Sequence, residues 1–149
     1  MYLCNDIGYT NNGIVILDDE LNVLEHNTVK INTKDLIQNN LKILGDYYLQ
    51  YRTSYNITHV FYEKPIMNGL SGSKLNNVVG ILLYLFSNLQ IKDVHPLRLK
   101  QKITGFGKAS KDDMKFHCEK IIKERGLNID ISKWNNHEVD ALCIGLYFN

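Results

Sequence analysis

Three carboxylates and one imidazole occupy positions in this 149-residue sequence where polar side chains are costly. Asp6 ends an apolar run near the N-terminus, and Glu63 ends a second apolar run in the middle of the chain. His137 and Asp140 stand three residues apart, so a helix would place them on one face. Carboxylates that converge from separate elements repel one another, and a hard divalent cation such as Mg²⁺ or Mn²⁺ relieves that repulsion. The pattern therefore predicts a metal centre built from these four side chains.

Each of these residues also has a simpler interpretation. Asp6 lies just before a glycine and could form a turn, and Glu63 could be an exposed residue at a strand end. Glu138 and Asp140 would complement the dipole of a helix that begins near them. A single histidine such as His137 is more often a surface or capping residue than a ligand. The order of the four residues along the whole chain is what favours a shared site.

A basic strip lies in the second half of the sequence. Residues 1–63 carry four Lys/Arg against eight Asp/Glu, whereas residues 64–149 carry thirteen against eight. Such a strip of basic residues is either a solvated charged face, the simpler interpretation, or a polyanion-binding surface. The net charge of +1 argues against electrostatic DNA binding over the whole surface. The strip contains no acidic residue between positions 98 and 111, and its basic residues are Arg98, Lys100, Lys102, Lys108 and Lys111.

The composition is that of an ordinary globular domain. Hydrophobic residues make up 44% and charged residues 22%, which argues against a disordered chain. The longest apolar run, Ile81–Phe86, is too short to span a membrane, and no signal peptide is visible. Three widely spaced cysteines without a CxxC pair favour reduced thiols. We therefore expect a single domain over residues 1–149, without a membrane segment, in the cytoplasm.

The spacing of apolar and turn residues predicts an α/β domain. Strands are expected over 2–6, 13–17 and 21–26, the third extending towards residue 31, in an antiparallel meander. Further along, the order is helix, strand, helix, strand, helix, helix. The expected bounds are a helix over 34–54 capped by Thr33, a strand over 57–63, a helix over 71–89 opened by Ser71 or Ser73, a strand over 91–94, a helix over 110–125 capped by Ser110 and stopped by Gly126, and a last helix capped by Asn135 or Asn136.

The predicted helix over 71–89 is apolar almost all round. A sheet can cover only one side of such a helix, so the other side needs a further cover. The simplest cover is a second copy of the chain across a two-fold axis. The outer side is assigned to some of Leu75, Val79, Leu82, Leu83 and Phe86.

Over nearly its full length the sequence resembles the RuvC-type Holliday-junction resolvases, which have the RNase H-like fold. The most specific motif is Lys-Gln-x-x-x-Gly-x-Gly-x-Ala-x-Lys, which begins at Lys100 and ends at Lys111. The other matching segments are Asp6-Ile7-Gly8, Gly13-Ile14-Val15, Glu63, Pro96-Leu97-Arg98-Leu99 and His137-Glu138-Val139-Asp140-Ala141-Leu142.

The resemblance implies a mixed five-stranded sheet, three strands antiparallel and two parallel, flanked by helices. It implies a homodimeric endonuclease that resolves four-way junctions and leaves 5′-phosphate and 3′-hydroxyl ends. Two Mg²⁺ or Mn²⁺ ions would be held by Asp6, Glu63, His137 and Asp140, with Asp6 as the bridging ligand. Lys100 and Lys111 would lie near the scissile strand, and Arg98, Lys102 and Lys108 on flanking phosphates. The divergence and short length suggest a phage-type member acting in a bacterial cytoplasm.

Three departures from the family pattern bear on this interpretation. The Gly-rich turn after the first aspartate is altered to Gly8-Tyr9-Thr10-Asn11-Asn12-Gly13. His137 stands where many members have a fourth aspartate, and imidazole is a competent ligand for the same ions. Ile66, with Met67 beside it, replaces the aromatic residue that contacts the junction. The alternatives are an RNase H-like nuclease on other nucleic acids and a branched-DNA-binding protein without catalysis. An actin-like ATPase would need a second lobe that 149 residues cannot hold. The sequence does not define a helicase partner.

Overall fold

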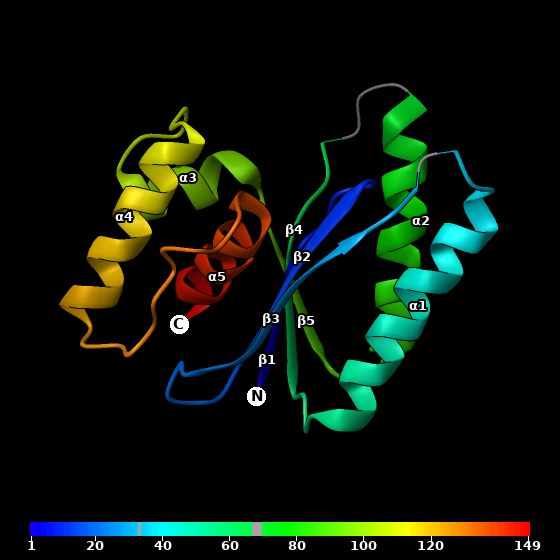
Figure 1. Cartoon of the computed structure of the whole chain (residues 1–149), viewed down its shortest axis with the longest axis horizontal. Coiled ribbons are helices and arrows are strands. Elements are labelled where there is room, and N and C mark those ends of the chain that lie inside the picture. Colours follow the sequence, from blue (N-terminus) through cyan, green and yellow to red (C-terminus); the bar gives the residue numbers. More distant parts are fainter. Residues whose placement is uncertain (33, 67–69) are drawn as a thin grey trace.

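A mixed five-stranded sheet lies between two layers of helices (Figure 1). The computed structural model describes residues 1–32, 34–66 and 70–149. The strand order across the sheet is β3-β2-β1-β4-β5, with the first three strands antiparallel and β1, β4 and β5 parallel. The predicted mixed sheet is therefore confirmed. The strands are β1 (Tyr2–Asp6), β2 (Asn11–Leu17), β3 (Val23–Lys30), β4 (His59–Glu63) and β5 (Gln90–Val94).

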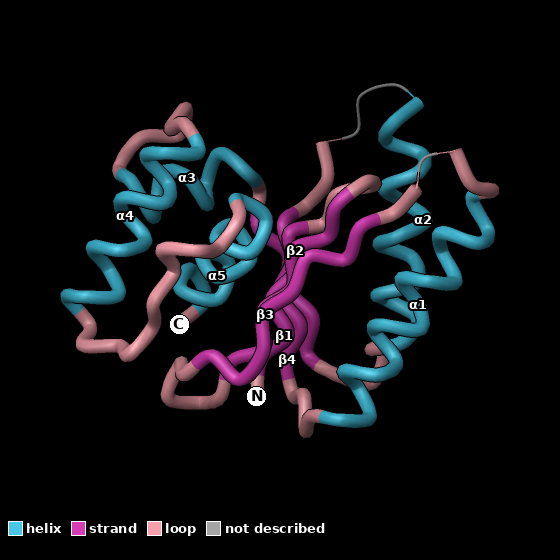
Figure 2. Tube along the Cα trace, viewed as in Figure 1, coloured by secondary structure: helices cyan, strands magenta, loops and turns pink. Residues whose placement is uncertain are grey.

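The central strands are buried on both faces because their alternate side chains enter two separate cores. Leu3 and Val60 lie in the core under α1 (Ile37–Ser54) and α2 (Leu70–Leu85). Their neighbours Cys4 and Phe61 lie in the opposite core, together with the apolar residues of α5. Figure 2 shows α1 and α2 on one side of the sheet and the other three helices on the opposite side. Those three are α3 (Pro96–Thr104), α4 (Lys111–Glu124) and α5 (Asn136–Phe148).

Local hydrogen bonds define where α4 and α5 begin. The Ser110 side chain accepts a hydrogen bond from the Asp113 amide, and the Asp113 carboxylate accepts one from the Ser110 amide. Asn135 and Glu138 form the same reciprocal pair at the start of α5. These capping boxes satisfy backbone donors that a helix start leaves unpaired. The predicted caps of both helices are confirmed.

The helix α3 was not predicted from the sequence. Pro96 occupies the first helical turn, where its missing N–H costs nothing. The His95 ring accepts a hydrogen bond from the Leu97 amide and caps the helix. At its other end, Gly105 has a φ of 80° and closes the helix in the left-handed region.

Several predicted bounds differ from the structure: β2 begins two residues earlier than predicted, and β3 and β4 each begin two residues later. The helix α1 begins at Ile37 without a side-chain cap, and Thr33, the predicted cap, lies outside the described residues. The helix α2 runs from Leu70 to Leu85 and so ends four residues before the predicted position. Ser71, one of its two predicted starting residues, has a side chain outside the described set. Among the residues that the structure describes, no helix has the length and hydropathy needed to cross a bilayer.

Fewer apolar side chains are exposed on the outer side of α2 than the sequence predicted. Leu82 and Phe86 are fully buried against the sheet, so their assignment to the outer side is wrong. Leu75 and Val79 are partly buried against the same core, because α1 packs along α2. Leu83 alone of the five predicted residues is well exposed, at 41%. Its neighbour Tyr84, which the sequence analysis did not single out, is 80% exposed.

Candidate active site

The fold brings two of the predicted carboxylates to the same edge of the sheet. β1 and β4 are parallel neighbours, and Asp6 and Glu63 are their last residues. The residues directly before them, Asn5 and Tyr62, are register partners. Carboxyl ends of adjacent parallel strands meet at one edge, which is where α/β sheets commonly carry their ligand sites. This placement follows directly from strand order.

The first turns of α5 contribute the remaining predicted ligands. α5 packs across β1 and β2. Its close approach depends on Gly13 of β2, because a Cβ atom there would collide with the backbone carbonyl of His137. The absence of a side chain at Gly13 lets His137 and Asp140 reach the strand ends.

Two direct contacts join these elements. His137 Nδ1 lies 2.8 Å from Asp6 Oδ2. Lys111 Nζ, at the first turn of α4, donates a hydrogen bond to Asp140 Oδ2 and forms an ion pair with it. The site therefore draws side chains from β1, α4 and α5, with Glu63 of β4 close enough to interact electrostatically with both aspartates.

The electrostatics of the site are those of crowded carboxylates. Burial, together with the charges of Asp6 and Asp140, raises the pKa of Glu63 to about 7. Burial also raises the pKa of Asp140, although Lys111 opposes this effect. The hydrogen bond with Asp6 raises the pKa of His137 and so favours its charged form. Burial tends to lower the pKa of Lys111, but the hydrogen bond and charge of Asp140, together with the charges of Asp6 and Glu63, raise it overall.

The donor set fits a hard divalent cation in its chemistry. Within the described part of the chain, no three His, Cys, Asp or Glu side chains stand close enough to hold an ion as they are now arranged. Instead, Lys111 donates a hydrogen bond to Asp140, and the His137 ring lies within hydrogen-bonding distance of Asp6. An ion at this position would require the Lys111 side chain to turn away from Asp140. The mutual repulsion of three carboxylates is the cost that such an ion would remove.

A buried polar network supports the loop that follows Asp6. The Asn5 side chain donates to the Tyr48 hydroxyl over 3.0 Å, and that hydroxyl donates to Asn12 Oδ1 over 3.3 Å. The Asn12 amide group in turn donates to the carbonyl of Gly8. Asn5, Asn12 and Tyr48 are all fully buried. The sequence did not predict this network, because its hydrogen bonds join residues 43 and 36 positions apart in the chain.

The basic strip divides into two kinds of residue. Lys100 Nζ donates to the carbonyl of Ala109 over 2.6 Å and so braces the loop between α3 and α4. Its charge also opposes the rise in the pKa of Glu63. Arg98, Lys102 and Lys108 are exposed. Of the two predicted junction contacts, Ile66 is 56% exposed and Met67 lies outside the described residues.

An aromatic stack lies beside the start of α5. The His26 ring of β3 stacks on Trp134, with ring centroids 4.1 Å apart. His26 Nδ1 also lies 3.3 Å from Glu138 Oε1, the carboxylate of the capping box. Thr28 exchanges hydrogen bonds with the capping residue Asn135. The strand β3 is thereby tied to the turn that carries His137.

The chain is similar to known resolvases in sequence and in fold. No family model matches it. The crossover junction endodeoxyribonuclease RuvC of Rickettsia conorii is 26% identical to it over 129 residues, 84% of this chain and 79% of that protein. The structure of T. thermophilus RuvC in complex with a Holliday junction substrate matches with a TM-score of 0.80 at 18% identity, covering 98% of this chain and 90% of that one.

A viral structure gives the same result for the fold. The fowlpox virus resolvase with its substrate Holliday junction DNA matches with a TM-score of 0.62 at 17% identity, covering 99% of this chain and 97% of that one. The resemblance of this chain to the RuvC-type Holliday-junction resolvases is therefore confirmed, by the Rickettsia protein in sequence and by these solved structures in fold.

Proposed function

We propose that this protein is a divalent-metal-dependent endonuclease that resolves Holliday junctions by symmetric hydrolysis of two phosphodiesters. The observation that carries the proposal is the convergence of Asp6, Glu63 and Asp140, with mutual charge repulsion, at one edge of a RuvC-like sheet. The similarity to the Rickettsia RuvC supports the substrate class. The products would be 5′-phosphate and 3′-hydroxyl ends. The whole chain would act as one domain, in the cytoplasm of a bacterium, as a phage-type member of the group.

Asp6, Glu63, His137 and Asp140 would hold two Mg²⁺ or Mn²⁺ ions. Such a pair of ions, when bound, stabilises the attacking and leaving oxygens of an in-line displacement at phosphorus. Asp140 is buried and fixed in α5, so its carboxylate is held in place before substrate arrives. Glu63 must lose its proton before it can act as a ligand.

Lys111 and the basic strip would hold the DNA. Lys111 neutralises Asp140 in the structure, and its ammonium group would be free to contact the scissile phosphate once an ion takes its place. Arg98, Lys102 and Lys108 would contact flanking phosphates, which positions a strand without reading its sequence. Ile66 and Met67 would face the centre of the junction. Lys100 would act mainly by holding the loop that leads to Lys111.

We further propose a homodimer formed through α2. Leu83 and Tyr84 remain exposed on this helix, and Gly80 has open space around it, so a second helix could approach closely. A two-fold dimer would present two identical metal sites to the two equivalent strands of a four-way junction. The dimer thus supports the paired incision that resolution requires.

The deciding experiment is cleavage of labelled four-way junction, fork and linear duplex DNA in Mg²⁺, Mn²⁺ or EDTA. We expect paired cuts in the junction with either ion, none with EDTA, and little cutting of linear duplex. Asp6→Asn should abolish cutting and leave junction binding intact or stronger, because less negative charge faces the phosphates. Binding without cutting by the unaltered protein under all ion conditions would contradict the proposal and favour a non-catalytic junction-binding protein. Equal cutting of all three DNAs would contradict the proposed substrate.

A further inference from the structure

A surface pocket beside α3 takes no part in the metal site. Its volume is about 560 Å³, within the roughly 300–1,000 Å³ of typical small-ligand pockets. Two large apolar side chains, Leu97 and Phe106, line it and are 53% and 60% exposed. The pocket is completed by Arg98, Gln101, Gly107 and Lys108.

The exposure of Phe106 is built into the fold. Its amide donates to the Thr104 hydroxyl over 3.1 Å, and that hydroxyl donates to the carbonyl of Phe106 over 3.0 Å. Gln101 Nε2 donates to the carbonyl of Gly105 over 2.6 Å and holds the same loop against α3. These hydrogen bonds fix the backbone of a loop whose aromatic side chain is exposed, and an exposed apolar side chain on an ordered loop favours a ligand.

The charge and place of the pocket indicate which ligand that is. Arg98 and Lys108 flank the apolar side chains, and no acidic residue occurs between positions 98 and 111. Lys108 lies three residues before Lys111, which contacts Asp140 in the candidate active site. In Figure 1 the loop between α3 and α4 lies at the upper end of its layer, the end towards which β1 and β4 run. A DNA strand that reaches the carboxylates would pass this loop.

We propose that the pocket is a base-binding site for the DNA substrate. The Phe106 ring and Leu97 would receive one unstacked nucleobase, while Arg98 and Lys108 hold the phosphates beside it. An aromatic platform flanked by cations is the general means of holding an unpaired base without reading its identity. The inference rests on the proposed function and adds a subsite to it. The site would hold an opened strand in place near the junction centre.

The test is a scan of four-way junctions in which one nucleotide at a time around the crossover is made abasic. Binding is measured in the Asp6→Asn background, so that no strand is cut. One abasic position should weaken binding about tenfold, the size expected for losing a base–aromatic stack. Adding Phe106→Ala should weaken binding of the intact junction by a similar factor. In that double variant the same abasic nucleotide should cause no further loss of binding. With Phe106→Trp in place of Phe106→Ala, the abasic nucleotide should still weaken binding, because an aromatic ring remains.

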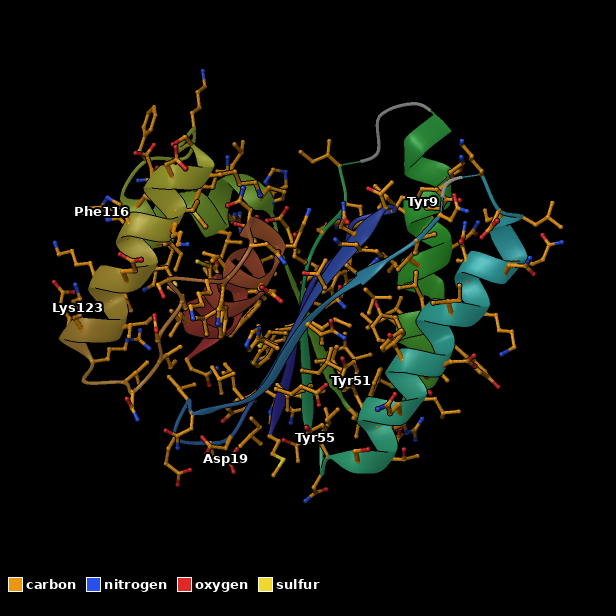
Figure 3. The ribbon with its side chains drawn as sticks, viewed as in Figure 1. Tyr9, Asp19, Tyr51, Tyr55, Phe116 and Lys123 are labelled. Atoms are coloured by element: carbon orange, nitrogen blue, oxygen red, sulfur yellow. The ribbon has the colours of Figure 1, made fainter. Side chains whose placement is uncertain are left out.

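Phe116 provides the matched control. It is 65% exposed on the outer side of α4 (Figure 3), so Phe116→Ala should leave binding and the abasic effect unchanged. Arg98→Ala should reduce the salt slope of binding by about one unit, but Phe106→Ala should leave that slope as it was. Additive losses from Phe106→Ala and every abasic nucleotide, or no loss at all, would overturn the base-binding site. Cleavage by the unaltered protein tests the proposed function separately, so the two failures are distinguishable.

Discussion

Asp6 should control both the charge repulsion among the carboxylates of the site and the response of the protein to a divalent ion. Its charge raises the pKa of Glu63, and Asp6→Asn removes that charge with little change of shape. In thermal unfolding, Mg²⁺ should stabilise the unaltered protein by about 1–3 kcal/mol at saturating concentrations. Asp6→Asn should lose most of this gain. Asp46→Asn, an exposed carboxylate of α1, is the control and should keep it. An equal Mg²⁺ effect in both variants would contradict the assignment of Asp6.

The pKa shifts of Glu63 and His137 predict that Mg²⁺ affinity and cleavage fall steeply as the pH is lowered, along an acid limb of the pH profile. Glu63 has its pKa raised to about 7, and that of His137 is also raised, so both hold protons that an ion must displace. Apparent Mg²⁺ affinity and cleavage should therefore rise with pH through about 7, with a slope near two protons. His137→Asp should stay active with a shallower limb, because one titrating group is gone. A limb of unchanged slope in that variant would show that His137 does not titrate with the site.

The same shift has a consequence for the metal-free protein. The pKa of Glu63 lies above its ordinary value of 4.5, so the folded chain binds a proton that the unfolded chain has already released. Stability in EDTA should therefore fall as pH rises from about 4.5 to about 7. Glu63→Gln should remove this part of the pH dependence, which urea unfolding at several pH values would measure.

Among the elements, the contact between β2 and α5 sets the geometry of the site. A Cβ atom at Gly13 would collide with the carbonyl of His137, so Gly13→Ala must displace the first turn of α5. We expect a loss of about 1–3 kcal/mol in the free energy of unfolding, as for other overpacked positions. Cleavage should fall more steeply than stability, because His137 and Asp140 move with the helix. Gly45→Ala in α1, which meets only ordinary contact at 3.8 Å, is the control and should fold and cleave normally.

Local patterns predicted the elements whose signals are strong. Alternating apolar residues defined β1, β2 and β4, and capping residues defined α4 and α5. The nine-residue helix α3 was not predicted, because its sequence is largely polar and begins with a proline. The sequence predicted that Asp6 and Glu63 lie at the ends of strands. The strand order of the sheet then brings these two ends together. The contact of Lys111 with Asp140 could not be predicted from the sequence, because it joins residues 29 positions apart through the packing of α4 on α5.

At the scale of the whole molecule, the proposed dimer depends on the exposed side of α2. Light scattering should give a mass near twice 17.2 kDa for the unaltered protein. Tyr84→Glu should yield folded monomers that lose paired incision, since this side chain is 80% exposed. Leu49→Glu, at an exposed position of α1, should leave the mass unchanged. Leu82→Glu should instead unfold the protein, because Leu82 is buried against the sheet. A mass near 17 kDa for the unaltered protein would contradict the dimer.

The stack of His26 on Trp134 gives the protein an intrinsic optical probe. Trp134 is the single tryptophan of the chain, so its emission arises from one place, directly before the cap of α5. A histidine ring 4.1 Å away makes that emission sensitive to small movements of the turn that carries His137. Titration with Mg²⁺ should therefore change the fluorescence without any label, and His26→Ala should remove most of the change. Ion binding could then be followed in real time, before a single phosphodiester is cut.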